Sequence, residues 1–561
     1  MKDARSSLLL RLLPSLTDVA FLLPVFFLFL TMGGATRMLE GDTGWHIRAG
    51  EWILAHGRVP DRDFFSFTKA GEPWFAWEWL WDVWFAWMHG RWGMEAVVLV
   101  SLGVICLTSA LLYRLVLRKA GNPVIAIAFT WLAVAASSLH WWARPHVFTM
   151  LFTVVFYEVL DRRYEGERSR LWVLPLVTVV WTNLHGGFVA GLVLIAFYAA
   201  GEFLAAAVET DPARRREALR RSLPYCWTGA ACLAATLVNP YSWRLHVHIA
   251  ALVGDPNSPL YRWVSEWMSI SFRPGPSRYF EILLVLSVGT ALWCLRGRRF
   301  AYALLLLAWL HQALVAARNI PIFAIVAAPL VASAAAEVIA AAARADLPGW
   351  LKRVPEFLSE LGAEIGSFER HARVHLAGAA GLILVAVLVY APQPPERFRA
   401  AYDPEKYPVE AIRKLGPGAL AGKLFSTDEW SDYIIYRLWP ATKVFMDGRL
   451  DLYGARFLEQ YGDLWNGKAD WEEIFNKYGI ETVLLPRETL LRAVLDASPR
   501  WSRVYQDKVA VVFRAAPSRP AGEGLTSSIA GDGIGGDPGC SASGPGSRTI
   551  VQLHTERREQ P

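Results

Sequence analysis

The sequence predicts an α-helical polytopic membrane protein of about 11 spans, with a small α/β soluble domain at its C-terminal end. The first observation is composition: of the 561 residues, 54% are hydrophobic and 19% are charged, which is too apolar for a soluble protein of this length. The second is that the apolar residues fall in blocks of about 17–24 residues, the length that crosses a bilayer. The third is that Lys and Arg gather in alternate short loops between these blocks.

The predicted spans are the apolar blocks themselves. They cover residues 19–37, 95–113, 123–140, 147–161, 171–185, 188–209, 223–239, 279–295, 300–317, 320–343 and 375–392. Every second loop is basic, as at Arg114 and Lys119 and again at Arg296 and Arg299. By the positive-inside rule, this predicts an inside N-terminus and an outside C-terminal domain. The net charge of +6 therefore reflects topology, and we expect membrane lipids and no nucleic acid as partners.

Three parts are predicted along the chain. Residues 1–392 form the transmembrane domain, and its first outer loop is 38–94. Residues 393–515 form an outward α/β domain, because short apolar runs alternate with helical patterns. The runs are 423–426, 443–446, 481–485 and 509–513, and the helical patterns lie near 408–415, 429–438, 455–465 and 488–495. Residues 516–561 are rich in Gly, Ser and Pro, which predicts a disordered tail.

An acidic motif follows the first span directly. Glu40, Gly41 and Asp42 begin it, and Gly44 and His46 continue it. Two carboxylates two residues apart at a membrane surface could hold a cation or act as a general base. The glycines would let the backbone turn sharply and approach a ligand. The alternative is a solvated turn with an incidental acidic pair.

The rest of the first outer loop is rich in tryptophan. Trp74, Trp77, Trp81 and Trp84 recur at three- and four-residue spacing. Tryptophan favours the headgroup zone, so this spacing predicts a helix lying in the membrane interface. We expect most of these rings to anchor the chain in the membrane, with sugar stacking by one or two as the alternative.

Polar side chains also gather at the other outward ends of the spans. They are His140, Arg144, His146, His185, Asn239, Glu266 and Arg318. Ionisable groups at membrane depth are costly and usually functional. Arg144 and Arg318 break the charge rule, and a guanidinium suits phosphate because its planar fork donates two hydrogen bonds. The alternative is that these side chains cap helix ends.

The pattern resembles the GT-C superfamily of membrane glycosyltransferases, which includes protein O-mannosyltransferases, aminoarabinose transferases and oligosaccharyltransferases. The resemblance rests on the inside N-terminus, the long first outer loop, the Glu40-Gly41-Asp42 motif, the many spans and the outward C-terminal domain. It implies a polyprenyl-phosphate-linked sugar donor and an inverting transfer on the outer face. It also implies that Asp42 activates the acceptor and that Glu40 is its partner.

The resemblance leaves a metal open. If a divalent metal is used, Glu40 and Asp42 would hold Mg²⁺ or Mn²⁺. In the C-terminal domain, Glu429-Trp430-Ser431-Asp432-Tyr433 is similar to a degraded WWDYG motif of oligosaccharyltransferases. Asp432, Asp447 and Arg449 would then line an acceptor site, and the alternative for them is salt bridges at strand ends.

The predicted function is a membrane glycosyltransferase that moves a sugar from a lipid-linked donor to an acceptor glycan, lipid or protein. His46, Arg144, His146, His185, Asn239, Glu266 and Arg318 are the predicted substrate ligands. A lipid-linked-glycan flippase is the first alternative, although it would need polar residues near the bilayer midplane and paired broken helices. A non-catalytic assembly protein is the second. We expect the chain in a bacterial inner (plasma) membrane, with its site on the periplasmic side.

Overall fold

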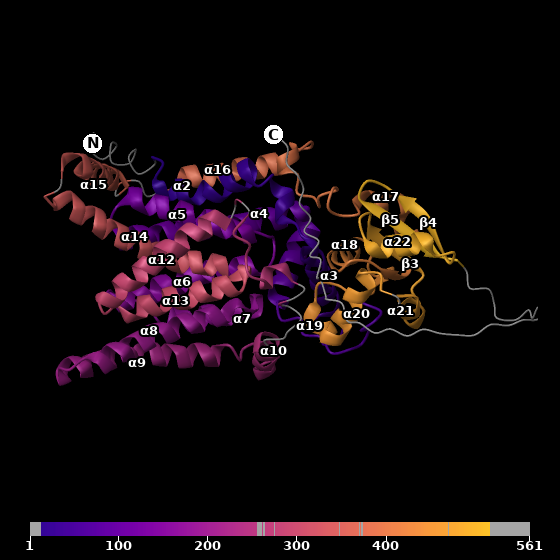
Figure 1. Cartoon of the computed structure of the whole chain (residues 1–561), viewed down its shortest axis with the longest axis horizontal. Helices are drawn as coiled ribbons and strands as arrows, with labels where there is room; N and C mark the ends of the chain where they lie inside the picture. The colour runs from indigo at the N-terminus through magenta and orange to yellow at the C-terminus, as the bar shows by residue number, and fades with distance from the viewer. Residues whose placement is uncertain are drawn as a thin grey trace, which may run out of the picture. The chain divides into compact units, whose positions relative to one another are not determined.

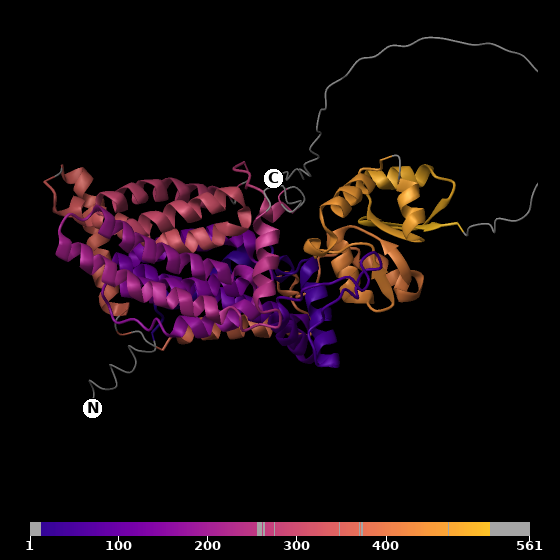
Figure 2. The ribbon, with the colours of Figure 1, turned by 90° about the horizontal axis from the view of Figure 1, so that it is seen from below.

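The structure is a computed structural model of the whole chain. It describes residues 13–516, apart from 255–260, 262–263, 274, 276, 347, 370, 372–373 and 469–470. The predicted tail beyond Ala516 lies outside these residues. The described residues up to Ala516 belong to one compact unit (Figures 1 and 2).

Long apolar helices make up the predicted transmembrane domain and lie alongside one another in both views (Figures 1 and 2). They are α2 (Leu16–Phe26, continued by a π-helical turn, Phe27–Thr31), α4 (Trp79–Ala120), α5 (Pro123–Ser137), α6 (His146–Tyr164), α7 (Val173–Leu184), α8 (Val189–Val208), α9 (Pro212–Ala235), α12 (Ser277–Arg296), α13 (Phe300–Val315), α14 (Ile320–Arg344) and α16 (Leu376–Val389). Each predicted span overlaps one of these helices.

Five helical segments of the described residues are long and apolar enough to cross a membrane. They are Trp79–Ala120, Pro123–His140, Gly186–Val208, Ser277–Arg296 and Ala317–Arg344. Several other helices are apolar but shorter, so the total of 11 spans and the orientation stay predictions. The helices fit a membrane protein, because apolar residues on them remain exposed, among them Val285, Leu292 and Val387.

The tryptophan-rich segment differs from the prediction. Trp74 and Trp77 precede α4, and Trp81 is fully buried against Phe85, with their rings stacked 4.0 Å apart. The prediction of one interfacial helix bearing all four tryptophans is therefore wrong. At the start of α4, Trp81 packs into the core, whereas Trp84 is 39% exposed.

The first outer loop also contains α3 (Gly41–His56), which packs against α18 (Asp428–Leu438) of the C-terminal domain. Two glycines allow this close approach. A Cβ atom at Gly44 would lie 2.6 Å from the Tyr436 Cβ, and one at Gly41 would lie 2.6 Å from the Glu429 carbonyl oxygen. Any larger residue would push the helices apart. The acidic motif and the WWDYG-like segment, predicted separately, therefore lie together.

The C-terminal part holds a five-stranded sheet of order β2-β1-β3-β5-β4. Its strands are β1 (Gly422–Phe425), β2 (Thr442–Val444), β3 (Thr482–Pro486), β4 (Trp501–Gln506) and β5 (Ala510–Ala515). β1 pairs with β2 and β3 in parallel, and β5 pairs with β3 and β4 antiparallel. The four predicted strands are confirmed. β4 was not predicted, because it is an edge strand with mostly exposed side chains and so lacks an apolar run.

The helices of this part also follow the prediction. α17 (Val409–Ala419), α18, α20 (Ala455–Trp465) and α22 (Leu490–Ala497) match the predicted helical patterns, whereas α19 (Leu450–Tyr453) and α21 (Trp471–Tyr478) were not predicted. The first outer loop joins the sheet, because Phe67 N–H donates to the Val444 carbonyl oxygen at 3.1 Å. The boundary predicted at 393 stays a prediction.

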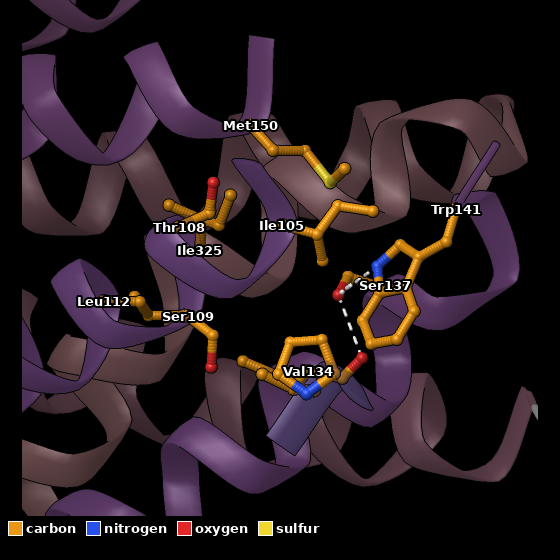
Figure 3. A pocket seen from close by; sticks show the side chains of 11 residues that line it. Ile105, Thr108, Ser109, Leu112, Val134, Ser137, Trp141, Met150 and Ile325 are labelled. Carbon is orange, nitrogen blue, oxygen red and sulfur yellow. Dashed lines mark hydrogen bonds between the residues drawn. The ribbon is translucent and has the colours of Figure 1, made fainter. Parts of the chain in front are cut away.

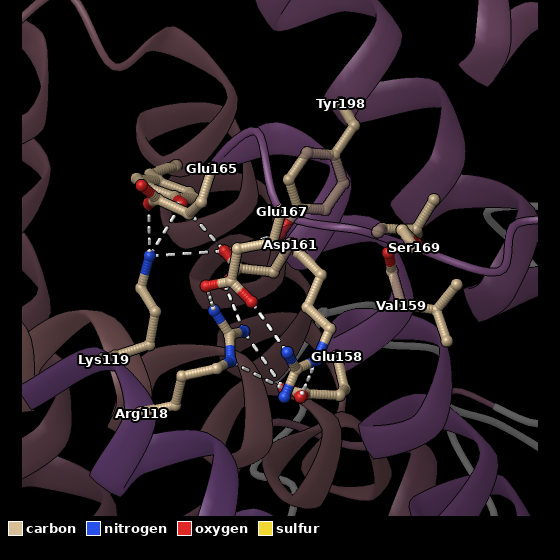
Figure 4. A network of polar contacts seen from close by, with 12 residues as sticks. Arg118, Lys119, Glu158, Val159, Asp161, Glu165, Glu167, Ser169 and Tyr198 are labelled. Carbon is tan, nitrogen blue, oxygen red and sulfur yellow. Dashed lines mark hydrogen bonds and ion pairs between the residues drawn. The ribbon is translucent and has the colours of Figure 1, made fainter.

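A buried charged cluster ties α4 to α6 and α13 at the C-terminal end of α4 (Figure 4). Asp161 is fully buried and accepts from Arg118 Nη2 at 2.5 Å and from the Tyr302 hydroxyl at 2.7 Å. Lys119 Nζ lies 2.7 Å from Glu165 Oε1. A buried carboxylate is costly unless it is paired, and Asp161 is paired with partners from α4 and α13. The cluster therefore joins these helices.

Candidate active site

A cavity of about 910 Å³ lies where α3, the loops at the ends of the apolar helices and the C-terminal domain meet. Its polar lining includes Glu40, Asp42, His46, Glu78, Arg144, His146, His185, Glu266, Arg318, Asp432 and Arg449. Apolar side chains of α10 (Trp243–Gly254) and the loop after it, such as Ile249, Leu252 and Val264, cover another wall. This volume is in the range of small-molecule sites, and its mixed lining suits an amphipathic ligand.

A second void, between α2, α4 and α5, is much smaller (Figure 3). Its volume is about 20 Å³, and its polar lining is a few hydroxyls such as Ser109 and Ser137 together with Trp141. Trp141 Nε1 donates to Ser137 Oγ at 3.3 Å. This space holds about one water molecule, so it is not a substrate site.

Arg144 lies between the two carboxylates of the acidic motif. Its Nη1 atom is 2.7 Å from Glu40 Oε1, and its Nη2 atom is 2.5 Å from Asp42 Oδ2. Glu266 Oε2 lies 3.6 Å from the same Nη1 atom. Asp42 is in the first turn of α3, where the helix dipole favours a negative charge. The solvated-turn alternative is wrong, because both acidic side chains are less than one fifth exposed.

Arg144 affects the pKa values of these neighbouring carboxyl groups to different extents. Burial raises the pKa of Glu40 to about 8; the charge of Arg144 opposes this, and the charges of Asp42 and Glu266 add to it. Burial also acts against ionised Glu266, but Arg318 and Arg144 lower its pKa to about 2. Burial would lower the pKa of Arg144, yet Asp42 and Glu40 raise it. Near neutral pH, Glu40 therefore keeps its proton and Glu266 is charged.

Asp432 reaches Asp42 from the C-terminal domain. The N–H of Gly448 donates to Asp432 Oδ1 at 2.9 Å. A Cβ atom at Gly448 would collide with Asp42 Oδ1 and Asp432 Oδ2, so both carboxyl groups lie directly over this glycine. Burial and the charge of Asp42 raise the pKa of Asp432 well above its usual value. The hydrogen bond between the Asp432 and Asp42 carboxyl groups acts in the same direction, because it favours the protonated form of Asp432.

Asp447 and Arg449 form a buried ion pair. Arg449 Nη2 lies 2.6 Å from Asp447 Oδ2 and 2.6 Å from Asp63 Oδ1, and its guanidinium lies 4.4 Å from the ring centre of Trp74. Asp447 is fully buried and does not line the cavity, whereas Arg449 lines it. This is the salt-bridge alternative at the end of β2, and it joins the first outer loop to the C-terminal domain.

Arg318 is less neutralised than Arg144. Its Nη1 atom lies 3.3 Å from Glu266 Oε1, and its guanidinium lies 4.4 Å from the ring centre of Trp267. Its side chain is 24% exposed and borders the apolar wall. Of the two predicted phosphate ligands, Arg318 therefore has more donors free for a ligand.

Of the other predicted substrate ligands, His146 lines the cavity and Asn239 does not. The Nε2 atom of His146 lies 2.9 Å from the His140 carbonyl oxygen. The Nδ2 atom of Asn239 donates to the Thr236 carbonyl oxygen at 2.7 Å, and its Oδ1 atom accepts from Tyr241 N–H at 2.8 Å. Asn239 thus caps a helix end, as the alternative expected.

Two carboxyl groups near the site were not predicted. Glu78 lines the cavity, and Asp82 lies behind it, with His46 between them. Glu78 and Asp82 are four residues apart in the tryptophan-rich segment, which places both on one face at the start of α4. That spacing was the available signal, but the tryptophans directed the interpretation to the membrane interface.

The side chains at the acidic motif do not form the ligand set of a divalent metal. Within the described ranges, no group of three or more His, Cys, Asp or Glu side chains is arranged to hold a metal ion. Arg144 stands between Glu40 and Asp42, the predicted ligands, and supplies the positive charge there. These residues do not fit Mg²⁺ or Mn²⁺ in this arrangement, and metal dependence stays a prediction.

Comparison with known proteins gives no match in sequence, since no family model and no curated protein matches the chain. Known structures do match. The Archaeoglobus fulgidus oligosaccharyltransferase AglB, in complex with an inhibitory peptide and a dolichol-phosphate, is 10% identical, with 84% of this chain and 69% of that chain covered and a TM-score of 0.51. Its apo form gives 11% identity, the same coverage and the same TM-score. Apo ArnT from Cupriavidus metallidurans is 14% identical over 88% of this chain and 97% of that chain, with a TM-score of 0.44.

The chain has the fold of the archaeal oligosaccharyltransferase. The likeness in fold that the resemblance implied is thereby confirmed. At these identities it concerns the fold and not the chemistry of individual residues.

Proposed function

We propose that this chain is a membrane glycosyltransferase that moves a sugar from a polyprenyl-phosphate donor to an acceptor on the outer, periplasmic face of the inner membrane. The observation that carries the proposal is Asp42, a carboxylate held by Arg144 and Asp432 at the wall of the large cavity. The fold supports the same function. The acceptor is a glycan, a lipid or a protein, as predicted from the sequence.

Asp42 is the general base of the proposed reaction. It takes the proton from the acceptor's nucleophilic atom, which forms a bond to the anomeric carbon of the sugar. The bond from that carbon to the phosphate oxygen breaks, and the lipid phosphate leaves with the electron pair. The configuration at the anomeric carbon inverts. A positioned base of this kind contributes about 10²- to 10⁴-fold in rate.

The two arginines have different tasks in this proposal. Arg144 is surrounded by Glu40, Asp42 and Glu266, so it orients the base. Arg318 meets only Glu266 among these and borders the apolar wall, so it suits the leaving phosphate of a lipid donor. Donors fixed in advance where negative charge develops stabilise the transition state.

The test compares cells that lack the protein with cells that produce Asp42→Asn, both profiled for glycans and glycolipids. The matched control is Glu51→Gln, on the same helix but away from the cavity and paired with Arg48. We expect Asp42→Asn to insert normally and to lose the same glycoconjugate as the deletion, while Glu51→Gln keeps it. If Asp42→Asn matched wild type while the deletion had a glycan defect, Asp42 would not be the base and a flippase would be favoured.

A further inference from the structure

At one wall of the cavity, four polar side chains follow one another: Asp82 and His46 are buried, and Glu78 and His185 are 12% exposed. His46 Nδ1 lies 2.6 Å from Asp82 Oδ1, and His46 Nε2 lies 3.3 Å from Glu78 Oε2. The other oxygen of Glu78, Oε1, lies 3.5 Å from His185 Nε2. Each oxygen of Glu78 therefore faces one imidazole, and this fixes the plane of its carboxyl group.

Contacts on the far side of His185 fix its tautomer. The N–H of Gly187 donates to His185 Nδ1 at 3.0 Å, so Nδ1 is an acceptor and a neutral ring carries its proton on Nε2. A Cβ atom at Gly187 would lie 2.7 Å from His185 Nδ1, so glycine is needed there. The protonated Nε2 atom of His185 is therefore the one that lies 3.5 Å from Glu78 Oε1, so an imidazole nitrogen faces each oxygen of the carboxyl group.

The wall is neutral near physiological pH. Burial raises the pKa of Glu78 to about 8. Burial also lowers the pKa values of His46 and His185 well below their usual range, and the charge of Arg144 adds to this for both rings. A phosphate group gains little from this part of the wall, because the side chains that face Glu78 are two neutral imidazoles and not cations. Hydroxyl groups, which both donate and accept, match a neutral carboxyl group.

An aromatic ring completes this part of the cavity. Trp77 lines it and lies against the backbone beside His185, because a Cβ atom at Gly186 would be 3.5 Å from the Trp77 ring. An apolar ring face beside a fixed polar group offers a surface for the ring of a sugar. Asp42 and His46 are one turn apart on α3, so this wall adjoins the proposed base.

We infer that Glu78, positioned by His46 and His185, binds hydroxyl groups of the donor's sugar and determines which sugar the protein accepts. This inference rests on the proposed function. A site built to hydrogen bond a hydroxyl group discriminates strongly against ligands that lack it, because its own polar groups are then left unpaired.

The test measures dissociation constants of purified full-length protein in detergent for three probes: polyprenyl phosphate, and the same lipid phosphate carrying mannose or glucose. We expect wild type to bind at least one sugar-bearing lipid more tightly than the bare lipid. Glu78→Ala should lose this preference by about tenfold or more, with an unchanged constant for the bare lipid. Glu78→Gln, which keeps a donor and an acceptor, should retain part of the preference.

Glu51→Gln is the matched control. Glu51 lies outside the cavity lining and also faces a histidine, since its Oε1 atom lies 3.8 Å from His89 Nδ1. We expect this variant to keep the wild-type preference. If Glu78→Ala kept the preference, or bound all three lipids more weakly by the same factor, the inference about Glu78 would be overturned, but the proposed function would not. The same would follow from a wild type that binds the bare lipid without any sugar preference. Wild type that binds none of the three would overturn the proposed function as well.

Discussion

Arg144 places its Nη2 atom 2.5 Å from Asp42 Oδ2, and this ion pair joins the loop before α6 to the first turn of α3. The same guanidinium bridges to Glu40 through Nη1 at 2.7 Å. A planar fork can hold two carboxyl groups in a fixed relative orientation, which a single ammonium group cannot do. The geometry of the proposed base therefore depends on a side chain far away in the sequence.

Arg144→Lys is expected to lower glycosyl transfer strongly while the protein still folds. Lysine keeps the charge, but it cannot bridge Glu40 and Asp42 at once. Arg144→Ala should be harsher, because breaking a buried pair destabilises a protein by about 3–5 kcal/mol. The measurement is the glycoconjugate level in cells together with the Tm of the purified variants. Arg62→Lys, in the exposed part of the first outer loop, is the control; equal losses in both Lys variants would contradict this role of Arg144.

Arg318→Ala is expected to weaken the binding of polyprenyl phosphate. A hydrogen bond to a charged group contributes about 1.5–3 kcal/mol, so the dissociation constant should rise by about tenfold to a hundredfold. Arg273→Ala is the control, because Arg273 is exposed in the preceding segment and does not line the cavity. If both variants lost affinity equally, general electrostatic attraction and not a phosphate site would be responsible.

The sequence predicted the apolar helices, four helices of the C-terminal part and four of the five strands, because apolar periodicity is a local property. Glu40 and Asp42 were also found, since they directly follow an apolar block. The approach of Asp432 to Asp42 could not be predicted in this way. It depends on α3 and α18, which are far apart in the chain and which meet only because Gly41 and Gly44 leave room.

Other parts of the site were missed for a different physical reason. Tryptophan is common both in membrane interfaces and in packed cores. The segment that contains Glu78 and Asp82 therefore allowed two interpretations, and the structure supports the buried one for Trp81. The placement of a carboxyl group between two imidazoles becomes visible only when α3, the start of α4 and the loop at His185 are brought together.

Gly44→Ala is expected to lower both stability and activity. The added Cβ atom would meet the Tyr436 Cβ at 2.6 Å and force α3 from α18, and overpacking of this kind costs about 1–3 kcal/mol. Gly90→Ala is the matched control, because Gly90 lies in α4 with open space around it. There, alanine should stabilise the helix by about 0.5–1 kcal/mol. The Tm of each variant tests this, and a Gly44→Ala protein as stable as Gly90→Ala would show that the two helices are not tightly packed.

The contribution of Glu78 to the stability of the folded protein is expected to fall as the pH rises from about 4.5 to about 8. Burial raises the pKa of Glu78 from 4.5 to about 8, so between these values the folded protein binds a proton that the unfolded chain has lost. Stability from this group is therefore fully present below pH 4.5 and is lost as the pH approaches 8.

Glu40 acts in the same direction, since its pKa is also raised to about 8. The lowered pKa values of His46 and His185 act in the opposite direction, so the comparison with wild type isolates Glu78. As the pH rises, the Tm of Glu78→Gln, which cannot ionise, should increase relative to that of wild type, while Glu51→Gln should follow wild type. Thermal unfolding of the three proteins across this pH range decides the matter: equal slopes for wild type and Glu78→Gln would mean that Glu78 is already ionised in the folded protein, and the neutral wall of the cavity would have to be abandoned.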